Sequence, residues 1–258
     1  MKHSFIDQYS DLDSFIHKLD PRTKFITSLV FIVLVVLTSI RNWQAFALYF
    51  CLIAICLAIS KLPPLYVLKR SLVIVPFVLV IAIFIPFFKP GEVAGSYNIW
   101  LWQVSVTYDG LFVLANVVTK AWLCILSLIL LSATTKFTDL LKGLKQLGVP
   151  KVIVLILSFM YRYIFVLVDE VMRMRQARDS RNFGGARLRQ LKTIGNMIGT
   201  LFIRSYERGE RIYVAMLARG FDGEIRSLHQ LNLQKIDAYF SVAFGLVLIS
   251  SVFIFWQL

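Results

Sequence analysis

The chain has 258 residues, 58% of them hydrophobic, and its 28 lysines and arginines against 15 acidic residues give a formal net charge of +13. Average soluble chains are about 45–50% apolar, so the long apolar runs here exclude an ordinary soluble domain and predict a polytopic membrane protein. The basic residues lie beside those runs and form no known nucleic-acid signature. We therefore expect them to face anionic lipid, and we expect no nucleic-acid partner.

Four apolar segments before residue 135 are predicted to cross the bilayer. Asp20-Pro21 marks the start of the first helix, because aspartate caps free N–H groups and proline suits the first helical position. Lys120 lies near the middle of the fourth segment, where an ionisable residue is a candidate functional residue, and we favour the alternative that it snorkels or pairs inside the bundle. The loop between the third and fourth segments leaves room for a short interfacial hairpin. The predicted spans are 25–40, 44–60, 71–88 and 110–134.

The stretch 136–235 is basic and polar, and a last span of about 20 residues follows at 236–256. If the N-terminus is cytoplasmic, the inner segments 1–24, 61–70 and 136–235 hold 4, 3 and 18 lysines and arginines, whereas the outer loops hold only Arg41 and Lys89. This asymmetry strongly favours an N-terminus inside and a C-terminus outside.

We therefore predict an all-α membrane protein with about five transmembrane helices and a cytoplasmic domain of long helices. The predicted domains are 1–135, with the lead-in and helices one to four, 136–235, with the cytoplasmic helices, and 236–258, with the last span. One segment, 152–168, is apolar enough to cross the membrane, but a crossing would place the arginines after it outside. We therefore predict that 151–181 lies against the membrane face of the bundle, covered by lipid and a protein partner.

Two short arginine motifs each end a long helical pattern in this cytoplasmic stretch. The motifs are Ala177, Arg178, Asp179 and Ala218, Arg219, Gly220. An arginine near a helix C-terminus is favoured by the helix dipole alone. Two such tips on successive helices also suit a two-fold partner, since a guanidinium can hold carboxylates or carbonyls bidentately in a groove.

Gly195 and Gly199 form a small-x-x-x-small pair in the second of these helices. Such a pair lets two helices approach closely where they cross. Glycines that are simply tolerated at these positions are the alternative interpretation.

Catalytic and metal-binding patterns are missing from the sequence. It contains no Gly-x-x-x-x-Gly-Lys-Ser/Thr loop, so the chain does not hydrolyse nucleotide by that route. The three histidines have no ligand-like spacing, and the three cysteines lie in apolar runs. We expect no enzyme activity, no cofactor and no metal site in this chain.

The arginine motifs and the N-terminal stretch resemble the transmembrane T component of energy-coupling factor (ECF) transporters, and more narrowly its cobalt/nickel branch, CbiQ. The resemblance covers the whole chain. Three stretches carry it: residues 12–24, which include Asp20-Pro21-Arg22-Thr23-Lys24, residues 159–181, and residues 215–223. The two motif arginines are 41 residues apart, and as a pair they are specific.

The resemblance implies a coupling subunit of an ATP-driven importer for cobalt or nickel ions. In this family the two arginine motifs dock into grooves on a pair of ABC-type ATPases, which hydrolyse the ATP. A separate membrane S component, CbiM-like in this branch, binds the metal, and a small accessory membrane subunit can be present. The resemblance also implies a bacterial or archaeal cell membrane as the location.

Two other functions remain open from the residues alone. A membrane enzyme acting on phosphate-bearing lipid would need paired acids near the membrane face, and a stand-alone carrier would favour internal repeats and polar groups at mid-membrane. Co-purification with an ATPase separates both from a coupling subunit.

Overall fold

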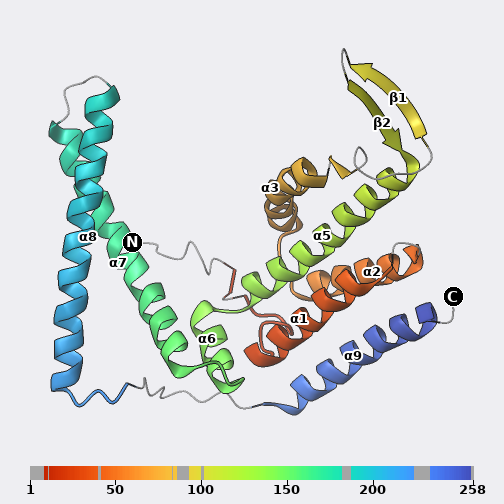
Figure 1. The fold of residues 1–258 in the computed structure, drawn as a ribbon. Coiled ribbons are helices and arrows are strands. Elements are labelled where there is room, and N and C mark those ends of the chain that lie inside the picture. Colours follow the sequence, from red (N-terminus) through yellow and green to blue (C-terminus); the bar gives the residue numbers. More distant parts are fainter. Residues whose placement is uncertain are drawn as a thin grey trace. The chain divides into compact units, whose positions relative to one another are not determined.

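The structure is a computed structural model, and it describes residues 9–10, 12–39, 42–82, 84–85, 93–99, 102–181, 187–223 and 233–256. Its helices confirm the all-α class, and one β-hairpin is added to them (Figure 1). The elements are α1 (Pro21–Leu37), α2 (Trp43–Ile59), α3 (Pro64–Ala82), β1 (Val93–Ile99), β2 (Trp102–Thr107), α5 (Tyr108–Thr134), α6 (Phe137–Gln146), α7 (Lys151–Arg181), α8 (Arg187–Ala218) and α9 (Lys235–Trp256).

The chain divides into two compact units, which we describe separately. The bundle unit comprises Ser4–Gly143 together with Leu231–Leu258, and the two-helix unit comprises Leu144–Gln230 together with Met1–His3. Most of α6 therefore belongs to the bundle unit. The membrane boundaries at residues 135 and 235 stay predictions.

The core of the bundle unit lies where α1, α2, α5 and α9 pack together. Phe31, Tyr49, Leu123 and Leu248 are almost completely buried there. The Tyr49 hydroxyl also bonds to Thr38 Oγ1 and to Ser251 Oγ, at 3.2 Å each, and so links α2 to the end of α1 and to α9. These three hydroxyl groups thus pair with one another, as an apolar environment requires.

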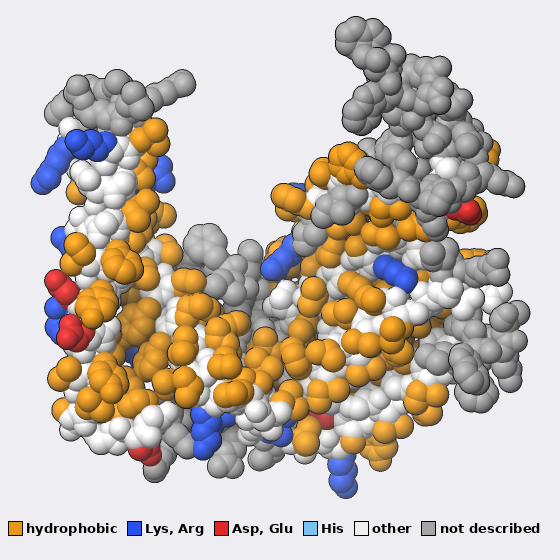
Figure 2. Space-filling model, in the orientation of Figure 1, with side chains coloured by type: hydrophobic (Ala, Val, Ile, Leu, Met, Phe, Trp, Pro, Cys, Tyr) orange, Lys and Arg blue, Asp and Glu red, His pale blue; other side chains and the backbone are white. Residues whose placement is uncertain are grey.

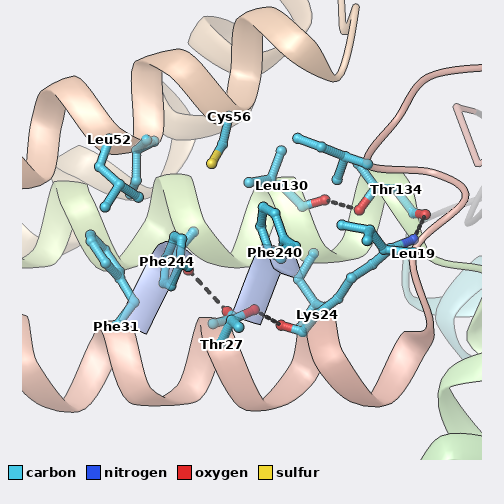
Figure 3. A pocket seen from close by; sticks show the side chains of 15 residues that line it. Leu19, Lys24, Thr27, Phe31, Leu52, Cys56, Leu130, Thr134, Phe240 and Phe244 are labelled. Atoms are coloured by element: carbon cyan, nitrogen blue, oxygen red, sulfur yellow. Dashed lines mark hydrogen bonds between the residues drawn. The ribbon is translucent and has the colours of Figure 1, made fainter. Parts of the chain in front are cut away.

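A cavity of about 40 Å³ lies inside this core (Figure 3). Phe31, Leu52 and Phe244 line one part of it, and Lys24 and Thr134 lie at the other. Ligand pockets usually measure about 300–1,000 Å³, whereas a single water needs only about 10–15 Å³. The cavity therefore suits a few water molecules and does not suit an organic substrate.

Local start signals are confirmed where the sequence predicted them. The Asp20 side chain accepts a hydrogen bond from the Arg22 N–H at 2.9 Å, with Pro21 at the first helical position of α1. The third helix differs from the predicted span 71–88: it begins at Pro64 and ends at Ala82, with Pro76 inside it. Hydropathy predicts which residues lie in the membrane, whereas the helix itself begins at Pro64, so the start of the helix and the start of the predicted span differ.

The loop between the third and fourth predicted spans contains a hairpin, as the sequence allowed. β1 and β2 pair antiparallel, with Ile99 opposite Trp102, and an irregularity lies between Val93 and Gly95. Lys120 pairs with the end of α1 through an exposed hydrogen bond: its Nζ donates to the Val36 carbonyl at 2.8 Å. Val36 lies in the last turn of α1, whose carbonyls lack partners within the helix, so a cation is favourable there.

Within the part of the chain that is described, two helices are long and apolar enough to span a membrane, namely α5 and α7. The shorter α2 is also apolar. Our prediction that α7 lies against the membrane rather than across it depends on the arginines after it, and length and hydropathy do not decide between the two.

Candidate functional site

The two-helix unit is built from α7 and α8, which have 31 and 32 residues. At a rise of about 1.5 Å per residue each helix is about 45–50 Å long. Glu170 of α7 accepts a hydrogen bond from Arg204 Nη1 of α8 at 2.7 Å, and Arg173 Nη2 lies 3.2 Å from the same carboxylate. The sequence analysis missed this contact between the helices, because a pair separated by 34 residues leaves no local spacing signal.

The first motif lies in the last turn of α7. Arg178 donates from Nε and Nη2 to Asp179 Oδ1, at 3.0 and 2.7 Å, and Arg175 Nε lies 3.7 Å from Asp179 Oδ2. The Arg178 side chain is 26% exposed. This guanidinium is therefore partly neutralised by the next residue of its own motif.

The second motif ends α8. The Phe221 N–H bonds to the Met216 carbonyl at 3.1 Å and the Gly220 N–H to the Leu217 carbonyl at 3.0 Å, which is the Schellman pattern of helix termination. Gly220 has φ of +76°, a conformation that glycine adopts without strain. Arg219 is the capping residue, it is exposed, and no ion pair is found for it among the described residues.

The two tips are thus chemically different. Arg219 offers a guanidinium with its donors free of any carboxylate that the structure describes, whereas Arg178 enters any docking step already bound to Asp179. Both can hold a carboxylate or a carbonyl through two parallel N–H donors.

Gly195 and Gly199 make no close helix contact in the described part of the chain. A Cβ atom built at either position meets nothing within 4 Å. The helix crossing predicted there is not formed with α7, so it stays a prediction for a partner helix.

Apolar side chains cover much of the outer surface of α7 and α8, and Figure 2 shows hydrophobic side chains over large areas of the molecule. They include Ile156, Met172, Ile198, Phe202 and Tyr206, all more than half exposed. Large exposed apolar surfaces mark contacts with a membrane or with a partner protein.

The described residues contain no group of three or more His, Cys, Asp or Glu side chains that could hold a metal ion.

Residues 13–231 match the profile of the CbiQ family, described as cobalt transport protein. The chain belongs to this family. It is therefore a T component of ECF transporters, a membrane protein that works with ATPase and S components and is itself a non-catalytic part of the transporter.

Individual relatives are similar to the T component over nearly its whole length. An energy-coupling factor transporter transmembrane protein of Clostridium kluyveri is 32% identical, over 99% of this chain and 98% of the relative. One of Leuconostoc gelidum is 30% identical, over 99% of both chains. An uncharacterized protein of Methanocaldococcus jannaschii is 28% identical, over 97% of this chain and 86% of the relative.

Proposed function

We propose that this T component is the coupling subunit of an ATP-driven importer for cobalt or nickel ions. Two ABC-type ATPase subunits hydrolyse the ATP, and the T component passes their motion to a separate S component that binds the ion. The observation that carries this proposal is the pair of long helices that each end at an arginine motif while exposing apolar side faces.

The docking sites for the ATPases are the two motifs, Ala177, Arg178, Asp179 and Ala218, Arg219, Gly220. The Schellman turn fixes the end of α8 with Arg219 at its C-cap, and the positive φ of Gly220 directs the chain away from it. This turn fixes the backbone beside Arg219, and the planar fork of a guanidinium loses less side-chain entropy per hydrogen bond on binding than an ammonium group does.

The S component packs against the exposed apolar faces of α7 and α8. These faces carry no partner in the described chain, and lipid alone would not explain why the same helices end in basic, exposed tips. The Gly195 and Gly199 pair lies on such a face and allows a partner helix to approach closely.

The metal is assigned to cobalt or nickel on the resemblance to the CbiQ branch and on the name of the matching family. The ion ligands belong to the CbiM-like S component, with which a small accessory membrane subunit can associate. The T component resides in the cell membrane in five spans, with its N-terminus and residues 136–235 in the cytosol.

Co-expression of the T component with its ATPases and S component tests this function. We expect all of them to co-purify, and we expect membrane vesicles to accumulate radiolabelled Co²⁺ or Ni²⁺ only with ATP. A T component that purifies without ATPases, or that carries the ion with no ATP, would contradict a coupling role.

A further inference from the structure

The first turn of α1, Asp20–Lys24, which we name the anchor turn, is built from buried charged residues. Asp20 is 6% exposed and Lys24 is 7% exposed. Burial of charged groups is costly unless each is paired or hydrogen-bonded. The hydrogen-bond partners of Asp20 and Lys24 therefore identify the elements that are bound to this turn.

Lys24 holds the end of α5. Its Nζ donates to the carbonyl of Thr134, the last residue of α5, at 3.0 Å (Figure 3). It also donates to the His17 carbonyl in the N-terminal lead-in at 3.1 Å. The last carbonyls of a helix lack partners within the helix and carry its negative partial charge, so a buried ammonium group stabilises them.

Asp237 holds the start of α9 against the same turn. The side chain is 3% exposed. Its Oδ1 accepts from the Asp20 N–H at 2.8 Å and its Oδ2 from the Gln234 N–H at 2.8 Å, and Thr23 Oγ1 lies 3.5 Å from Oδ1. One carboxylate therefore caps the first turn of α9 and binds the first turn of α1.

Gly143 of α6 packs directly on the anchor turn. A Cβ atom at this position would lie 3.4 Å from Arg22 Cγ and 3.6 Å from Pro21 Cβ. These are ordinary contact distances for one methyl group, whereas a longer side chain would push α6 away from α1.

The chain enters the two-helix unit through α5 and α6, and after leaving it continues into α9. The end of α5, Gly143 of α6 and Asp237 in the first turn of α9 all contact the anchor turn. Apolar contacts are enough to hold helices together, and in some proteins buried, hydrogen-bonded polar groups fix one relative position at a cost in stability.

We propose that the anchor turn is the fixed mechanical joint through which movement of the two-helix unit reaches the membrane helices. Lys24, Asp237 and Gly143 are positioning residues for energy coupling, and they neither bind the ATPases nor touch the ion. This inference rests on the proposed coupling function.

A reversible disulfide tests whether the joint is fixed. Cysteines are introduced by Pro21→Cys and Gly143→Cys into a chain from which Cys51, Cys56 and Cys124 have been replaced. The Cβ atoms would lie 3.6 Å apart, within the range of about 3.5–4.5 Å that a disulfide needs. In the full complex we expect the same number of Co²⁺ or Ni²⁺ ions per ATP before and after oxidation. If oxidation stops uptake while the ATPases stay bound, α6 must leave α1 during transport, and the inference is wrong.

Loosening the joint should uncouple the complex. Lys24→Met and Gly143→Leu should lower the number of ions imported per ATP about fivefold or more, the lower range of coupling between sites. The ATPases should still co-purify, since Arg178 and Arg219 are unchanged. The matched controls are Lys18→Met, at an exposed lysine of the lead-in, and Gly143→Ala; both should behave like the wild type.

The failures of the two proposals are distinguishable. If the wild-type chain transports and Lys24→Met and Gly143→Leu keep its ratio of ions to ATP, the inference alone falls. If the wild-type chain never binds an ATPase, the proposed function falls and the inference falls with it.

Discussion

Replacing Arg219 by alanine removes the exposed guanidinium at the end of α8 and leaves the helix termination intact, because the Schellman bonds use only backbone groups. If this guanidinium is buried in a groove of an ATPase, its loss leaves the partner groups unpaired. Such truncations cost about 2–5 kcal/mol, or about 30-fold to several-thousand-fold in affinity.

Arg178→Ala should cost less than Arg219→Ala. Arg178 already binds Asp179 at 2.7 Å, and it must give up that contact or share it on docking. Pairs with this degree of solvent exposure are worth about 0.2–1 kcal/mol, so the two variants should differ by up to about fivefold in affinity. For the same reason Asp179→Asn should strengthen docking slightly.

Titration of the purified ATPases onto each variant in lipid nanodiscs measures these differences. The double variant should lose binding by more than either single variant, because two linked contacts reinforce each other through effective concentration. Arg208→Ala is the matched control on α8, since no ion pair is found for Arg208 among the described residues. Wild-type affinity in the double variant would show that these arginines are ordinary helix-end charges, and a larger loss for Arg178→Ala would refute the asymmetry.

Three further results are expected. In a chain without native cysteines, a cysteine at position 181 should resist impermeant thiol reagents added outside intact cells, while one at 257 should react; labelling of 181 from outside would overturn the five-span topology. Glu170→Gln should weaken the packing of α7 on α8 by no more than about 1 kcal/mol, because the Arg204 side chain is 59% exposed. The loss should appear as faster hydrogen exchange of the α7 amides, and the charge swap Glu170→Arg with Arg204→Glu should restore part of the protection. Burial lowers the pKa of His17 below 6.5, against the opposing effect of the Tyr9 carbonyl that bonds to Nε2 at 3.0 Å. The folded state therefore favours neutral His17, so its contribution to the free energy of unfolding should be fully present above pH 6.5 and be lost as the pH drops through the folded pKa. Thermal unfolding of the wild type and of His17→Gln across this pH range measures the contribution. Identical pH profiles would exclude His17 as the cause.

Local signals in the sequence determined the all-α class, the positions of most helices and their ends. Asp20-Pro21 starts α1 and Gly220 stops α8, because capping depends on the backbone and side chains of four or five neighbouring residues. The two arginine motifs could be found for the same reason, since each occupies one helix end.

The side-chain contacts of the first motif and of the glycine pair could not be predicted from the sequence. That Asp179 binds Arg178 rather than water is a matter of side-chain rotamers, and that Gly195 and Gly199 face open space depends on where α7 runs. A spacing of four residues fixes which face of a helix two glycines share, but not what lies opposite that face.

Only the tertiary structure brought the anchor turn together. Asp20 and Asp237 are 217 residues apart, and Lys24 and Thr134 are 110 residues apart. In the sequence each is one charged or polar residue beside a helix end, with a cap as its simplest interpretation. Packing of α1, α5 and α9 removes water from all of them at once, and the buried charges must then find partners on whichever helix ends lie nearest. That choice is made by the three-dimensional arrangement of the helices, to which no local pattern of residues gives access.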